Sequence, residues 1–107
     1  MDEYDALIAR LTATGIPFRE AAWDVAPAPP YGVYALDGGG ADLWGSDRMQ
    51  DTTLTGTVDL YVKGRGRDKK QLVDAALHTA GVSWYLNSIQ YEKDTRLTHF
   101  EWVFEVI

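Results

Sequence analysis

The sequence contains no cysteine among its 107 residues. This absence excludes a disulfide framework, a zinc site built on thiolates and a cysteine nucleophile. The sequence also has no apolar run that approaches the ~20 residues of a membrane-spanning helix, so we expect no membrane span. Residues 1–5 are acidic and are followed by no signal-like apolar run, so we expect no secretory signal.

Basic residues are also scarce, because 10 Lys and Arg stand against 16 Asp and Glu, which gives a formal net charge of −6. A negative chain repels the phosphate backbone, so we expect no sequence-specific binding of nucleic acid. The length fits one domain spanning residues 1–107. A domain of this size can bury a core without disulfides or metals, and the 4 Trp, 6 Tyr and 3 Phe suit both a core and an interface.

Motifs of known catalytic chemistry are missing as well. His78 and His99 stand about twenty residues apart, outside any spacing typical of metal ligands, so we expect structural roles for both. The glycines at 38–40 and in the turn 64–67 lack the spacing of a phosphate-binding loop. No serine has the flanking glycines of a nucleophile elbow. We therefore predict no enzyme activity, no cofactor and no metal site.

The first segment with a regular pattern is 2–14, which is predicted to be a helix. Gly15 is placed to adopt the left-handed conformation after the helix, and Pro17 blocks continuation. The apolar residues at helical spacing form a single stripe, which consists of Tyr4, Leu7, Ile8 and Leu11.

A second helix is predicted to begin after the turn 64–67. Asp68 is expected to cap it, with Gln71 completing a capping box, and Gly81 is expected to end it. The predicted apolar face consists of Leu72, Val73, Ala76, Leu77 and Ala80.

Strands are predicted at 18–23, 31–37, 51–63, 84–91 and 97–107. The strand 51–63 has the clearest alternation, with Leu54, Gly56, Val58, Leu60 and Val62 on its core face and Thr53, Thr55, Thr57, Asp59 and Tyr61 on the other. Gly56 interrupts the core face and predicts a bulge or a close approach by a packed helix. In the last strand, the residues expected in the core are Phe100, Trp102, Phe104 and Val106.

These elements follow the order α-β-β-β-α-β-β. The prolines within 26–30 predict an extended connector along a sheet edge, and 38–49 is predicted to be a long loop that contains Trp44. The economical arrangement is a single α+β domain, with a mixed, mostly antiparallel sheet and two helices packed on one face.

This layout resembles that of the tail-terminator, or tail-completion, proteins of long-tailed bacteriophages. The similar parts are the helix ending in Gly15-Ile16-Pro17, the entry Pro30-Tyr31-Gly32-Val33-Tyr34, the glycine-rich loop, the strand ending Val58-Asp59-Leu60-Tyr61-Val62-Lys63, Asp68 at the second helix and the closing strand 100–106. The resemblance covers most of the chain and depends on layout rather than on a catalytic motif.

The resemblance implies a structural virion protein that forms a homo-oligomeric, hexameric ring at the head-proximal end of the tail. Such a ring caps the tail tube, ends polymerisation of the tube protein and offers a surface for head–tail joining, with DNA passing through it. The implied partners are further copies of the chain, the tail tube protein and a head–tail connector or neck protein. The implied location is the virion, with assembly in the host cytoplasm.

Three surfaces are candidates for these contacts. They are the long loop 38–49, the polar face of the strand 51–63 and the turn 64–67, here called the basic turn. The candidate interface residues are Trp44, Thr53, Thr55, Thr57, Asp59, Tyr61, Arg65 and Arg67. Trp and Arg are enriched among the residues that dominate interface energetics, and a cluster of basic side chains suits an acidic partner or a DNA channel.

Two other functions are compatible with the sequence. One is a head–tail connector or other neck protein, which differs from a terminator in its partners. The other is a small ligand-binding domain or enzyme with a pocket under the loop 38–49.

Overall fold

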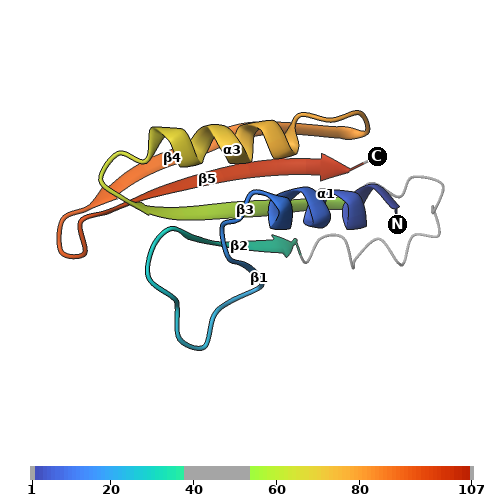
Figure 1. Ribbon diagram of the computed structural model, residues 1–107. Coiled ribbons are helices and arrows are strands. Elements are labelled where there is room, and N and C mark those ends of the chain that lie inside the picture. The colour runs from blue at the N-terminus through green and yellow to red at the C-terminus, as the bar shows by residue number, and fades with distance from the viewer. Residues whose placement is uncertain (1, 38–53, 107) are drawn as a thin grey trace.

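Residues 2–37 and 54–106 fold into two helices and one five-stranded sheet. The structure is a computed structural model that describes residues 2–37 and 54–106, so Trp44 and Thr53 lie outside the described residues. The elements are α1 (Asp2–Ala13), β1 (Phe18–Glu20), β2 (Tyr31–Leu36), β3 (Leu54–Lys63), α3 (Arg67–Leu77), β4 (Val82–Glu92) and β5 (Leu97–Val106). The predicted element order and the α+β class are confirmed (Figure 1).

The sheet has the strand order β1-β2-β3-β5-β4. β1 pairs in parallel with β2, and the other neighbouring pairs are antiparallel. Both helices lie on the same face of this sheet (Figure 1). The α3 segment connects β3 to β4, which run parallel to each other with β5 between them. The predicted mixed, mostly antiparallel sheet with both helices on one face is confirmed.

The core lies between the helices and the inner face of the sheet. Alternate residues of β3 and β5 point into it, as period-2 patterning requires. The buried strand residues are Val58, Leu60, Val62, Phe100, Trp102, Phe104 and Val106. The core predicted from these two strands is therefore confirmed, with the exception of Leu54, which is only partly buried.

Helix α1 buries one apolar stripe. Tyr4, Leu7 and Leu11 are buried, while Ile8 is half-buried at the edge of the core. Gly15 follows the helix with φ of +84°, which confirms the predicted left-handed position.

Helix α3 begins earlier than predicted. Its N-cap is Gly66, with φ of +56°, and no side chain caps the helix. A Cβ at Gly66 would lie within 2.1 Å of a Val62 methyl group, so the tight exit from β3 requires glycine there. The prediction that Asp68 caps the helix is wrong, because the helix begins at Arg67 and Asp68 lies within the first turn.

Helix α3 also ends earlier than predicted. Its last residue is Leu77, and the amide of His78 donates to carbonyl oxygens of the preceding turn. Gly81 has φ of +85° but stands at the entry to β4 rather than at the helix end. Ala80 is consequently exposed and does not belong to the apolar face of the helix.

The first strand is shorter than the predicted 18–23. β1 stops at Glu20, because Ala21 adopts φ of +69° and leaves the extended conformation. Trp23 therefore lies in the connector, where its indole N–H donates to the carbonyl oxygen of Gly32 at 2.9 Å. Among the described residues, the other predicted strands differ from the observed bounds by at most two residues, and residues 51–53 and 107 lie outside the described residues.

Gly56 is closely approached, but not by a helix. A Cβ there would lie 2.3 Å from the carbonyl oxygen of Ala35 and 2.7 Å from the ring of Phe104. These contacts come from the two neighbouring strands, so the predicted approach by a helix is wrong. Gly56 pairs regularly with both strands, and the irregularity of the sheet instead lies in β4, between Leu86 and Ser88.

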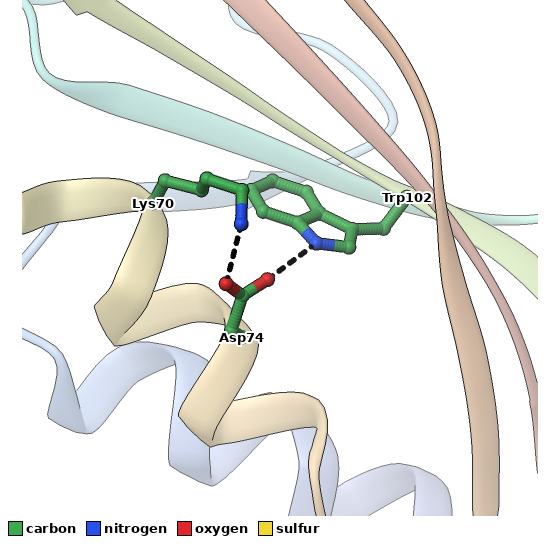
Figure 2. A network of polar contacts seen from close by, with 3 residues as sticks. All are labelled: Lys70, Asp74 and Trp102. Carbon is green, nitrogen blue, oxygen red and sulfur yellow. Dashed lines mark hydrogen bonds and ion pairs between the residues drawn. The ribbon is translucent and has the colours of Figure 1, made fainter. Parts of the chain in front are cut away.

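A polar contact joins α3 to the centre of the sheet (Figure 2). The indole N–H of the fully buried Trp102 donates to one carboxylate oxygen of Asp74 at 2.9 Å. The other oxygen accepts a hydrogen bond from the ammonium group of Lys70 at 2.7 Å. A buried indole N–H needs such an acceptor, because burial prevents it from donating to solvent water.

We expect Asp74→Ala to lower the free energy of unfolding by about 2–3 kcal/mol, because it leaves the buried indole N–H of Trp102 without an acceptor. Asp74→Asn keeps an acceptor oxygen and should lose less than half as much. Lys70→Gln removes only the surface ion pair and should cost at most about 0.5 kcal/mol. Urea unfolding of the three variants checks this order, and equal losses for Asp74→Ala and Asp74→Asn would contradict it.

Candidate functional site

The sheet face opposite the helices, here called the outer face, carries most of the predicted interface residues that the structure describes. Residues that pair directly across antiparallel strands share a face, and the pairing places β2 and β5 residues beside those of β3. The side chains at its centre are Thr55, Thr57, Asp59 and Tyr61 of β3, Tyr31 and Val33 of β2, and His99, Glu101 and Val103 of β5. Both helices of the described chain lie on the other side of the sheet (Figure 1).

A row of three stacked rings crosses this face. The ring centroids of Tyr31 and Tyr61 are 5.0 Å apart, with 17° between the ring planes. Tyr61 and His99 follow at 4.3 Å and 18°. The three residues are direct partners on neighbouring strands, so the row runs perpendicular to the strands. Stacking restricts the rotamers of all three side chains and leaves a preformed surface.

His99 is also fixed by a carboxylate. Its Nε2 lies 2.7 Å from Oδ1 of Asp59, and both side chains are about one-fifth exposed. The hydrogen bond to Asp59 is the main cause that raises the pKa of His99, while partial burial acts in the opposite direction. The pKa of Tyr61 is raised as well, first by burial and then by the charge of Asp59.

A shallow hollow of about 350 Å³ adjoins the row of rings. The connector after β1 forms one wall, with Trp23, and Tyr31 and Tyr61 form another. The guanidinium group of Arg19 lies 5.8 Å from the centroid of the Trp23 ring, within the range of a cation–π contact. The outer face thus combines a row of stacked rings with a small depression beside it.

The predicted interface residues do not form one cluster. Thr55, Thr57, Asp59 and Tyr61 share the outer face, as their alternation predicted. Arg65 and Arg67 lie apart from it, beside a groove at the start of α3. Trp44 and Thr53, together with the pocket expected under the loop 38–49, fall outside the described residues.

Tyr31 and His99 belong to this face but were not among the predicted site residues. The alternation of the last strand places His99 opposite the core set, which was the available signal. Their contact with Tyr61 depends on the pairing of three strands, which the sequence alone does not give.

Within residues 2–37 and 54–106, no group of three or more His, Asp or Glu side chains is arranged to hold a metal ion. His78 packs edge-on against Trp84, whereas His99 stacks on Tyr61 on the outer face. In the same part of the chain, no helix has the length and apolar character needed to cross a membrane.

No protein-family model matches the sequence, and no curated protein matches it with significance. The function is therefore proposed from the resemblance in sequence layout and from the chemistry of the surfaces.

We expect the contribution of His99 to stability to depend on pH. Its pKa is raised on folding, so the stability it contributes is fully present below the unfolded value of about 6.5 and is lost as pH rises through the folded value. His99→Gln should therefore cost about 1–2 kcal/mol near pH 5.5 and clearly less near pH 9.

Urea unfolding at the two pH values measures this difference. In an Asp59→Asn background, the same His99→Gln change should show much weaker pH dependence, because the carboxylate that holds the imidazolium has been removed. A cost for His99→Gln that is equal at both pH values, or larger at high pH, would contradict the assignment.

Proposed function

We propose that this chain is a structural virion protein of a long-tailed bacteriophage, which forms a ring that caps the tail tube. The ring ends polymerisation of the tube protein and offers a surface for joining the head. The tail assignment comes from the resemblance in sequence layout. The structural observation that favours association is the outer face, where a row of stacked rings and short polar side chains lies on the side of the sheet away from both helices.

The composition of the outer face favours protein contact over simple solvation. Antiparallel sheets often expose one polar face to water, and the threonines of β3 suit that role. The stacked Tyr31, Tyr61 and His99 are different, because tyrosine is enriched in interfaces and contributes area at low entropic cost. Their rotamers are already restricted, so association would order few further side chains.

A closed ring needs two different surfaces on each subunit, because each subunit binds the next through a heterologous interface. The outer face provides one such surface, and acidic side chains such as Asp59 and Glu101 lie on it. The basic turn with Arg65 and Arg67 lies elsewhere on the molecule. The basic turn is therefore a distinct second surface, which suits an acidic partner.

Light scattering on the purified protein, alone and mixed with tail tubes of the same phage, tests the proposal. We expect a species larger than the 11.9 kDa monomer, either in free solution or at tube ends. Thr57→Arg places a long charged side chain at the centre of the outer face and should weaken this association by about tenfold or more. A strict monomer that never binds tube ends would exclude the ring function.

Ala75→Arg is the matched control. It adds the same side chain at an exposed position of α3, on the opposite side of the sheet, and should leave association unchanged. Both variants should keep the thermal transition of the wild type. Capture of portal or adaptor proteins in place of tube protein would assign the chain to the connector instead of the terminator.

A further inference from the structure

A groove of about 810 Å³ lies on the helix side of the sheet, where α3 begins. The hairpin that joins β4 to β5 extends beyond the N-terminal end of α3, so this end of the inner face has no helix above it (Figure 1). The residues that define the groove are Arg65, Arg67 and Lys70 at its rim and Ile89, Tyr91 and Phe100 at its floor.

The floor is apolar and accessible. Ile89 and Tyr91 are 57% and 58% exposed, although they pair with the buried Phe100 and Thr98 and therefore point to the helix side. The irregularity between Leu86 and Ser88 shifts the alternation of β4 and brings both residues to this side. Large exposed side chains grouped in a concavity are typical of a binding surface.

The rim is basic in a chain with a net charge of −6. The ammonium group of Lys70 is already bound to Asp74, and Lys69 lies 3.8 Å from the carboxylate of Asp68. Among the described residues, no carboxylate lies within ion-pair distance of Arg65 or Arg67. Within the part of the chain that the structure describes, these two guanidinium groups are therefore available to a ligand that carries negative charge.

The groove is held in shape by its own backbone. Gly64 and Gly66 both have positive φ, and the side chain of Val62 packs closely under Gly66. The hydroxyl of Thr98 donates to the carbonyl oxygen of Gly64, which joins the turn to β5. A preformed groove loses little conformational freedom when it binds a ligand.

We propose that this groove binds an extended acidic segment of a partner protein, with apolar side chains that enter the groove and carboxylates that pair with Arg65 and Arg67. The apolar floor favours a ligand with apolar side chains, and the basic rim favours a ligand with carboxylates. The inference stands without the ring function, because it uses only the groove and can be tested on the monomer.

The position of the floor favours a polypeptide over other anionic ligands. Ile89 and Tyr91 belong to β4, which is an edge strand among the described elements. Its outward N–H and C=O groups can bond to an extended peptide that runs beside the groove. Nucleic acid would gain nothing from the aliphatic Ile89 and would be repelled by the net negative charge.

Fluorescence anisotropy with three labelled probes tests the proposal. The first is a short peptide in which glutamate alternates with leucine and phenylalanine, the second has lysine in place of every glutamate, and the third is a single-stranded oligothymidine. We expect saturable binding of the acidic peptide, with a Kd between about 1 μM and 1 mM, and much weaker binding of the other two.

Two variants with matched controls locate the binding. The double variant Arg65→Glu and Arg67→Glu should weaken binding about tenfold or more. Its control is the double variant Arg19→Glu and Lys63→Glu, which changes the net charge by the same amount on the outer face and should leave binding unchanged. Ile89→Asp should also weaken binding about tenfold. Its control is Tyr85→Asp, which changes an equally exposed residue on the other face of β4 and should leave binding unchanged.

Each outcome decides the proposal, provided that circular dichroism shows every variant folded. Loss of acidic-peptide binding in both groove variants, with both controls unaffected, supports it. Three results overturn it: no saturable binding of the acidic peptide, binding that the groove variants leave unchanged, or oligothymidine binding that is as tight as peptide binding and insensitive to Ile89→Asp.

Discussion

The hydrogen bond between the indole of Trp102 and Asp74 holds α3 against the centre of the sheet (Figure 2). A tryptophan at the centre of an inner strand is buried on all sides, and its N–H needs an acceptor that no sheet backbone offers. Asp74 supplies this acceptor from the helix, while Val73 and Leu77 bury apolar surface on either side of it. The groove follows from this position, because α3 begins short of the end of the hairpin that joins β4 to β5.

Most of the fold could be predicted because β3 and β5 alternate regularly over ten residues each. Their inward residues identified the core and the face that the helices cover. The ends of α3 could not be predicted, because backbone geometry decides them. Gly66 takes the left-handed conformation required by the tight turn over Val62, which displaces Asp68 from the cap, and Gly81 serves the entry to β4 rather than the helix end.

The surfaces were only half predictable for a similar reason. The period-2 pattern correctly placed Thr55, Thr57, Asp59 and Tyr61 on one face, since that depends on a single strand. Recognition of the row through Tyr61 needs the pairing of three strands, and recognition of the groove needs the shift within β4. Both depend on contacts between residues far apart in the sequence. The outer face suits association between copies of the chain, whereas the groove suits a flexible acidic partner, so the two surfaces can act together.

The central claim is that copies of this chain associate through the outer face of β3 and β5. An electron cryomicroscopy reconstruction of tail tubes capped by the protein tests it most directly. The account predicts a closed ring in which Thr57 and Tyr61 lie at the contact between neighbouring subunits, with the helices on the other side of each sheet. A ring whose subunits touch only through their helices, with the outer face open to solvent, would contradict it.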